Sequence, residues 1–488
     1  MRVSGVLAEH LSSDQNALRG GSLMKLRTIA ILFFSTVTAV ISHAQTFTSL
    51  ASLSDNTGAE PNAIGQQANG KLWVTTFGQG KFDCGTAFQA SLVGKLSYRS
   101  NFSCTGGNEP QGLTLGRDGN YYGVTFFGGS GNAGTVFKRT PTAVLTVLYN
   151  FTSDGSSGSG PVGTLALGPD GNFYGATYSS SSSNNYSGTL FKITPGGTLT
   201  TIYTFCLKFS CPDGSQPYSS PVLAMDGNFY GTTYGGGAHG VGTMYRITPQ
   251  GILTTLYSFD PSVDSVFFPT APLVQAANGN FYSVVSQGGA NNDGAVFEIT
   301  PSGNFTVLHN FDGTDGYFPT GLMQATDGNF YGTTAGVDNQ INGSIFQMTP
   351  AGNLTMLHKF NGTDGLSPVM LIQDTNGTLY GVTSGGGNVY CAYDPSYGCG
   401  TIFSLDVGLS PFVETVPAVG PIGAPVTILG TNLIGVKSVK FNGVSSQFQA
   451  KSSSEILTTV PAGATTGTIT VTDRDGALVS NVRFTVTN

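Results

Sequence analysis

The sequence predicts an all-β protein that consists of a seven-bladed β-propeller followed by an immunoglobulin-like β-sandwich. Three observations lead to this fold class. A unit of about 50 residues recurs seven times, and repeats of this period build solenoids or propellers. The array begins with a spare strand and ends one strand short, which is typical of a closed ring. After residue 408, a different pattern of short strands begins.

The composition suits short strands joined by tight turns. Glycine accounts for 70 of the 488 residues, and only 10% of the residues are charged. Soluble domains carry about 25% charged residues, and disorder requires high charge with few aromatic residues, which make up 11% here. The net charge of −7, without a Lys/Arg cluster after residue 44, excludes nucleic acid as a partner because phosphate binding needs a basic face.

Residues 1–44 are predicted to be an upstream extension and a secretory signal peptide. From Met24 on, two basic residues precede an apolar run over 29–41, and a small-x-small site ends at Ala44. This is the layout of a signal peptide, and the run is shorter than the roughly 20 residues of a membrane span. We therefore expect translation to start at Met24 and the mature chain to be exported by a bacterium, without a transmembrane segment.

A turn dipeptide marks each repeat of the region 45–408. Asn-Gly or Asp-Gly is the strongest short signal for a β-hairpin, because both residues tolerate positive φ. Each dipeptide precedes an aromatic-rich strand, such as NFYGTT from Asn228, and the dipeptides lie 49 to 56 residues apart. Their glycines are Gly70, Gly119, Gly171, Gly227, Gly279, Gly328 and Gly377.

Two further strands complete each repeat. A glycine-rich loop of variable length leads to a third strand that opens with a motif such as GTVF at Gly134. A Thr-Pro turn follows in five repeats, and then comes a fourth strand that alternates apolar and polar residues, as in LTTIYTF from Leu199. Four short antiparallel strands without a helical period describe a propeller blade.

The two ends of the array predict ring closure. The seventh repeat lacks its fourth strand, whereas the segment 47–53, FTSLASL, matches the fourth strand 305–311 and precedes a linker-like SDNTGAEP. A strand from the N-terminus that completes the last blade removes the exposed edges of an open array. The remaining residues, 409–488, contain several short alternating strands and predict a small β-sandwich.

Both regions are similar to known families. The repeat resembles the GloVer tandem repeat of bacterial surface and exported proteins, through DGNFYGTT, GT(V/L)F and the TP-G turn. The tail resembles an IPT/TIG domain, through VTILGTNL, VKFNG and VPAGATTGTITV. The first resemblance implies a protein without assigned chemistry, and the second implies a spacer or binding module. The blades also look like those of streptogramin lyase, an enzyme, but a shared fold does not carry a function.

The six cysteines form three couples that are close in sequence: Cys84 and Cys104, Cys206 and Cys211, and Cys391 and Cys399. We expect three disulfides, which suit an oxidising compartment. A zinc site is the alternative, although the couples lie far apart and lack CxxC spacing.

Histidine offers little support for catalysis. His309 and His358 occupy the fourth-strand position that holds tyrosine in other repeats, so we expect both to pack. His239, in a variable loop, is a weak candidate for a catalytic base, and a plain surface residue is the alternative. The first strands, which should line the central channel, are apolar and small, with no histidine and no carboxylate pair before the turn. A catalytic channel should carry titratable groups there.

Hairpin geometry places the loops between second and third strands on one side of the ring, together with the linkers between repeats. We call this side the loop face and the opposite side the turn face. Variable loops on a rigid scaffold usually carry binding. Aromatic residues at fixed repeat positions should form the core, which leaves irregular loop residues as candidates for ligand binding: Tyr186, Tyr390, Tyr393, Asp394 and Tyr397.

The linkers also contain acidic residues near glycines. Asp312, Asp315 and Asp364 could contribute to a calcium site, since calcium takes 6–8 oxygen ligands. The alternative is that these side chains cap turns.

Together these observations favour an exported, non-catalytic binding or adhesion protein. We expect a monomer without a cofactor, calcium excepted, that presents its loop face to an extracellular glycan or protein, in solution or at the cell surface. The alternative is a secreted lyase or hydrolase that acts at the same face.

Overall fold

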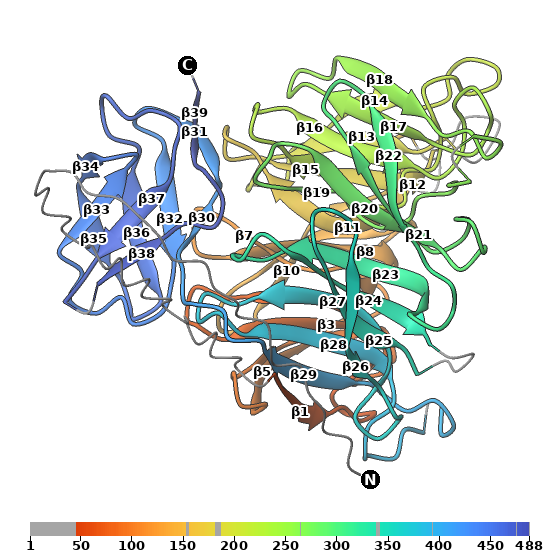
Figure 1. Ribbon diagram of the computed structural model, residues 1–488, viewed down its shortest axis with the longest axis horizontal. Helices are drawn as coiled ribbons and strands as arrows, with labels where there is room; N and C mark the ends of the chain where they lie inside the picture. The colour runs from red at the N-terminus through yellow and green to blue at the C-terminus, as the bar shows by residue number, and fades with distance from the viewer. Residues whose placement is uncertain are drawn as a thin grey trace, which may run out of the picture. The chain divides into compact units, whose positions relative to one another are not determined.

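A computed structural model describes residues 45–152, 156–180, 187–263, 265–337, 342–392, 394–474 and 476–487 (Figure 1). The predicted signal peptide lies outside these ranges. All regular elements in the described ranges are β-strands. In this part of the chain, no helix has the length and apolar character needed to cross a membrane.

Seven antiparallel sheets form the blades predicted for 45–408. The first blade contains β2 (Ala59–Gln66), β3 (Leu72–Gly78), β4 (Thr86–Ala90) and β5 (Leu96–Asn101), the second contains β6 (Asn108–Pro110), β7 (Thr114–Leu115), β8 (Tyr121–Phe127), β9 (Thr135–Arg139) and β10 (Leu145–Asn150), and the third contains β11 (Ser159–Leu167), β12 (Phe173–Ser179), β13 (Thr189–Ile193) and β14 (Leu199–Thr204). The fourth blade contains β15 (Val222–Leu223), β16 (Phe229–Thr233), β17 (Thr243–Ile247) and β18 (Leu253–Ser258), and the fifth contains β19 (Val274–Gln275), β20 (Phe281–Val285), β21 (Ala295–Ile299) and β22 (Phe305–Asn310). The sixth blade contains β23 (Tyr317–Gln324), β24 (Phe330–Gly336), β25 (Ser344–Met348) and β26 (Leu354–Lys359), and the seventh contains β27 (Leu366–Gln373), β28 (Leu379–Gly385) and β29 (Thr401–Asp406).

The seventh blade takes its outer strand from the beginning of the chain. Strand β1 (Thr46–Ser52) pairs antiparallel with β29, with Phe47 opposite Leu405, and the two lie side by side in Figure 1. The ring of Phe47 stacks on that of His358 in the sixth blade, with 3.6 Å between the ring centroids. The prediction that a strand near residue 50 closes the ring is therefore confirmed.

Aromatic side chains at fixed repeat positions join neighbouring blades. A tyrosine on the second strand of one blade packs on a phenylalanine of the next, as in Tyr174 on Phe229 and Tyr230 on Phe281, with 4.1 and 4.3 Å between centroids. These side chains are at most 2% exposed. The expectation that the repeated aromatic residues form the core is confirmed.

The Asp-Gly turns hold these tyrosines from the turn face. The carboxylate of Asp226 accepts hydrogen bonds from the amide and side chain of Asn228 and from the hydroxyl of Tyr230, at 2.8 to 3.0 Å. Burial, and then the bond to Asp226, raises the pKa of Tyr230 to about 12. The same arrangement recurs at Asp118, Asp170 and Asp327.

The tail folds as a β-sandwich with its own core. One sheet has the order β30-β32-β36-β35, the other β34-β33-β37-β38, and β31 pairs with β39 in parallel. Their bounds are β30 (Glu414–Val416), β31 (Val419–Pro421), β32 (Pro425–Leu429), β33 (Ser438–Phe441), β34 (Val444–Ser446), β35 (Phe448–Ala450), β36 (Glu455–Thr459), β37 (Ile469–Thr472), β38 (Ala477–Val479) and β39 (Thr485–Thr487). Buried residues such as Ile428, Phe441 and Ile456 fill the space between the sheets.

Candidate functional site

Every linker enters its blade through a proline, and the residue before that proline has a left-handed backbone. The φ angles of these residues lie between 48° and 63°. The seven residues are Glu60, Glu109, Gly160, Gln216, Phe268, Phe318 and Ser367. Such angles are uncommon outside glycine, and only one of the seven is glycine. They form a ring of backbone strain at the loop-face end of the channel.

Backbone hydrogen bonds between blades hold this conformation. The amide of Glu60 donates to the carbonyl of Cys399 at 3.2 Å, and the amide of Gln216 donates to that of Ser187 at 3.1 Å. Each acceptor directly precedes the glycine that opens the third strand of the preceding blade. Strained backbone persists where the surroundings over-determine it, and such positions cluster at binding sites.

The residue after the proline contributes to a central cavity in six of the seven blades. The cavity has a volume of about 620 Å³ and is lined by residues of all seven blades. The post-proline residues that line it are Asn62, Gln111, Tyr218, Thr270, Thr320 and Val369. Because one structural position carries an amide, a ring, hydroxyls and an aliphatic group in turn, the cavity is chemically asymmetric.

Aromatic residues from the first, fourth and seventh blades contribute to the cavity wall. Phe77, Tyr218 and Tyr397 line the cavity. Tyr218 also contacts the rings of Tyr178 and Tyr234, each at 5.7 Å between centroids. Ring contacts continue from these residues across the second to fifth blades, and the full series comprises Phe127, Phe126, Tyr178, Tyr218, Tyr234, Phe268 and Phe267.

Carboxylates also lie at the mouth of the cavity. Burial, and then the charge of Asp394, raises the pKa of Glu60, which lines the cavity. Burial, and then the charge of Glu60, raises the pKa of Glu109. Across the described ranges, neither glutamate forms an ion pair with a basic side chain. The mouth therefore carries excess negative charge on the side of the first, second and seventh blades.

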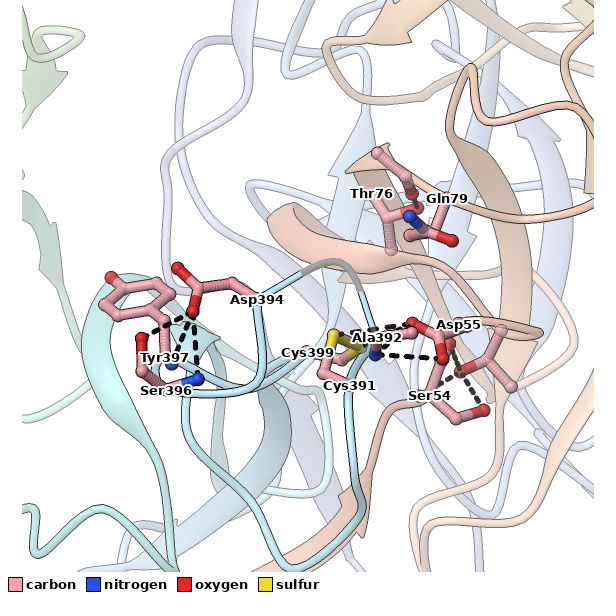
Figure 2. The surroundings of a disulfide bond; sticks show 12 residues. Ser54, Asp55, Thr76, Gln79, Cys391, Ala392, Asp394, Ser396, Tyr397 and Cys399 are labelled. Carbon is pink, nitrogen blue, oxygen red and sulfur yellow. Dashed lines mark hydrogen bonds between the residues drawn. A yellow bond between two sulfur atoms is a disulfide. The ribbon is translucent and has the colours of Figure 1, made fainter.

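The loop 391–399 of the seventh blade positions Asp394 and Tyr397. The amides of Ser396 and Tyr397, and the Ser396 hydroxyl, donate to Asp394 Oδ1 at 2.7 to 3.0 Å, which lowers the pKa of Asp394. The Tyr397 hydroxyl lies 2.8 Å from that of Ser384. Figure 2 shows Asp394, Ser396 and Tyr397 on one side of the Cys391–Cys399 disulfide and Asp55 on the other.

The predicted ligand-binding residues thus differ in their position relative to the cavity. Tyr397 lies in the cavity wall, and Asp394 is close enough to Glu60 to raise its pKa. Tyr390 is 72% exposed and is not part of the cavity lining. Tyr186 and Tyr393 lie outside the described residues.

His239 is not among the residues that line the cavity. Its Nε2 atom is 3.4 Å from Asp260 Oδ2, and its side chain is 44% exposed. His309 and His358 pack as expected, and each ring bonds a linker aspartate, with Nε2 2.6 Å from Asp315 and 3.0 Å from Asp364.

The candidate calcium ligands cap the linker turns. Asp312 Oδ1 accepts from the amide and hydroxyl of Thr314, and Asp315 Oδ1 accepts from the amide of Asp312. Asp364 Oδ1 accepts from the amide of Asn361. This geometry is that of the alternative interpretation, turn capping, and calcium binding at these residues stays a prediction.

The structure contains the three disulfides that the spacing predicts: Cys84–Cys104, Cys206–Cys211 and Cys391–Cys399. Among the described residues, the one group of three metal-ligating side chains with close ligand atoms is Asp55, Cys391 and Cys399. Because both sulfur atoms belong to a disulfide, they do not provide the thiolates that zinc requires.

Sequence reasoning missed the glutamates and the post-proline residues. It assigned the channel to the apolar stretches further along each first strand and expected no carboxylate there. A signal did exist, because a proline recurs at one position of all seven linkers, flanked by residues that differ from repeat to repeat. A repeated proline beside variable polar and aromatic residues marks the mouth of the channel.

Comparison with known proteins agrees with this architecture. The Gloeobacter/Verrucomicrobia repeat matches residues 34–208 and 203–393, and the IPT/TIG domain matches residues 411–486. A search of the curated proteins finds no match.

Among solved structures, a streptogramin B lyase is 14% identical, with a TM-score of 0.51, over 74% of this chain and 97% of that chain. A fungal alcohol oxidase of the AA5 family, in complex with copper, is also 14% identical with a TM-score of 0.51, over 91% of this chain and 99% of that chain. These likenesses establish the fold alone.

Proposed function

Since the chain belongs to the Gloeobacter/Verrucomicrobia repeat family and carries a C-terminal IPT/TIG domain, we propose that it is an exported, non-catalytic binding protein. Its ligand enters the cavity on the loop face. Three disulfides are consistent with an extracellular protein.

The observation that carries the proposal is the cavity itself. Ligand sites are concave, of about 300–1,000 Å³, and combine aromatic surface with a few convergent polar groups. The cavity of about 620 Å³ has this size, and Tyr218, Tyr397 and Glu60 supply these two kinds of groups. The rigid ring keeps the wall in place before a ligand arrives, which limits the entropic cost of binding.

The alternative is a secreted lyase or hydrolase that uses the same cavity. One observation favours it: the raised pKa of Glu60, because carboxyl groups with raised pKa values are frequent general acids or bases. Copper chemistry, as in the AA5 oxidase, does not fit this cavity. Among the described residues, its lining contains no histidine or cysteine, the ligands that copper prefers.

An array of glycans and peptides, followed by affinity measurements, tests the proposal. Replacing Tyr218 or Tyr397 with alanine should weaken the affinity of any ligand by about tenfold or more, since tyrosines that a ligand covers often dominate binding energy. Phe209→Ala is the control, because Phe209 is 99% exposed and lies outside the cavity lining.

Two results would count against the binding protein. Affinity that falls only in Phe209→Ala would place the ligand elsewhere. Turnover of the ligand that disappears in Glu60→Gln, while binding persists, would promote the enzyme.

A further inference from the structure

We propose that the cavity receives the cationic side chain, Lys or Arg, of a basic peptide segment on a partner protein. This inference rests on the proposed binding function and names the chemistry of the ligand. The site combines the carboxylate of Glu60, backed by Glu109 and Asp394, with the aromatic rings of Tyr218 and Tyr397.

The charge of the mouth lacks a counterpart within the described residues. Burial and a neighbouring carboxylate both raise the pKa of Glu60, and the same two causes act on Glu109. Neither glutamate is in an ion pair with a basic residue of the described ranges. A cation that enters the cavity would relieve this repulsion, and the net charge of −7 would attract a basic partner from a distance.

The spacing of the carboxylates disfavours a bare metal ion. Within the described chain, the close group of metal-ligating atoms is Asp55, Cys391 and Cys399, which does not include Glu60, Glu109 or Asp394. The three carboxylates therefore do not converge as a close group of ligands for one small ion. An ammonium or guanidinium group on a long side chain can bond one carboxylate and still lie on an aromatic face, which attracts cations through its quadrupole.

The wall is held in position before binding. Asn62 Nδ2 donates to the carbonyl of Pro110 at 2.8 Å, and Asn62 Oδ1 accepts from Thr75 Oγ1 at 2.8 Å. Gln111 Nε2 donates to the carbonyl of Glu109 at 3.1 Å. The bond from Asn62 to Pro110 joins the first and second blades beside the two glutamates, and the other two bonds orient side chains within each of these blades.

The lining of the cavity favours a protein over an amino sugar. Besides its aromatic rings, the wall includes the aliphatic side chains of Leu322, Val369 and Leu371, which offer no stacking surface for a sugar ring. Lys and Arg side chains have long apolar stems that pack along such a surface while the charged group stays free to bond a carboxylate. A cationic side chain of a peptide therefore matches both parts of the lining.

Calorimetric titration with matched probes tests the proposal. A peptide with four lysines is compared with the same peptide in which every lysine is acetylated, and a glucosamine tetramer is compared with its N-acetylated form. We expect the lysine peptide to bind at least about tenfold more tightly than the acetylated one, a preference that falls with added salt because surface charges are screened. The two sugars should bind weakly or not at all.

Variants locate the effect. Glu60→Gln and Glu109→Gln should each reduce the affinity for the lysine peptide by about threefold to tenfold, as expected for one charge at a partly exposed site. Asp406→Asn is the control. It removes a charge at the turn-face end of β29 and keeps the acceptor for the amide of Gly408. Thermal melting of each variant verifies that the fold is intact.

The outcomes separate this inference from the proposed function. Equal affinity for the lysine and acetyl-lysine peptides, or tight binding of the glucosamine tetramer alone, overturns the basic peptide but leaves a binding protein. An equal loss of affinity in Asp406→Asn and Glu60→Gln overturns the site. If no ligand of any kind responds to Tyr218→Ala and Tyr397→Ala, the proposed function itself fails.

Discussion

The two faces of the ring are built from the same repeat, yet they use it differently. On the turn face, four blades carry the same Asp–Asn–Tyr arrangement with nearly the same distances, as at Asp170 and Asp226. On the loop face, the post-proline position changes from Asn62 to Gln111 to Tyr218 around the ring. Positions that repeat hold blades together, whereas positions that vary give the cavity its chemistry.

The faces also differ in how their polar groups are satisfied. Four turn-face aspartates, Asp118, Asp170, Asp226 and Asp327, accept several hydrogen bonds each. The loop face carries strained residues before proline, and two glutamates whose pKa values are raised by burial and then by a neighbouring carboxylate, Asp394 for Glu60 and Glu60 for Glu109. Such features lower the stability of the folded state, and proteins commonly retain them where they serve binding.

The largest effect should come from opening the ring on which both faces depend. Deletion of 45–53 removes the strand that pairs with β29 and leaves its edge exposed. We expect the melting temperature to fall by more than about 10 °C, or the protein to aggregate. Deletion of 409–488 is the matched comparison, because the sandwich has its own core and takes no strand from the blades. Equal melting temperatures for both deletions would contradict closure by β1.

A turn-face substitution should reduce stability without affecting binding. Asp226→Ala removes the acceptor for Asn228 and for the hydroxyl of the buried Tyr230. Leaving a buried donor unsatisfied costs about 1–3 kcal/mol, so urea unfolding should show a loss of roughly this size. Asp226→Asn, which keeps an acceptor, should lose less. A reduced ligand affinity in folded Asp226→Ala would contradict the assignment of stability to the turn face and of binding to the loop face.

A repeated pair at the loop-face end of the strands sharpens the comparison. The hydroxyls of Thr233 and Thr243 are buried and lie 2.9 Å apart, and five other blades have an equivalent hydroxyl pair. The fifth blade instead pairs Val285 with Ala295. If residues that recur in most blades stabilise the fold on both faces, Thr233→Val should destabilise the protein by about 1–2 kcal/mol.

The double variant Thr233→Val/Thr243→Ala reproduces the fifth blade. It should cost less than the sum of the single variants, since replacing both partners of a buried hydrogen bond is close to neutral. A double-mutant cycle measured by urea unfolding gives the coupling energy. Strict additivity would show that the hydroxyl pair contributes no shared bond.

The repeated features are the ones that the sequence predicts well. Asn-Gly and Asp-Gly turns, the third-strand GT motif and the strand near Phe47 depend on local chemistry that recurs seven times, so each blade supports the assignment of the others. The disulfides follow because their partners are close in the chain. The cavity was not predicted, because Glu60, Tyr218 and Tyr397 are up to some 340 residues apart and meet only through the ring.

The same reasoning explains why the sequence did not distinguish single loop residues from one another. Tyr390 and Tyr397 belong to one loop and look alike in the sequence, yet only Tyr397 reaches the cavity. Its hydroxyl is held by Ser384, which belongs to β28, whereas Tyr390 extends into solvent. Loop residues are directed by individual tertiary contacts, and hairpin geometry alone does not specify them.

Replacing Glu60 should have the smallest effect on stability, and unlike the other variants it should stabilise the protein. Glu60→Gln removes a carboxylate whose pKa is raised in the folded state, first by burial and then by Asp394. Because the unfolded chain has an ordinary pKa of about 4.3, ionised Glu60 lowers the free energy of unfolding above that pH, and protonated Glu60 does not. We therefore expect the variant to melt at the same or a slightly higher temperature than the parent at pH 7, with the difference vanishing near pH 4. Melting curves between pH 4 and 8 measure this. A variant that is less stable at pH 7 would show that Glu60 supports the fold, and the loop face would then lose its distinction from the turn face.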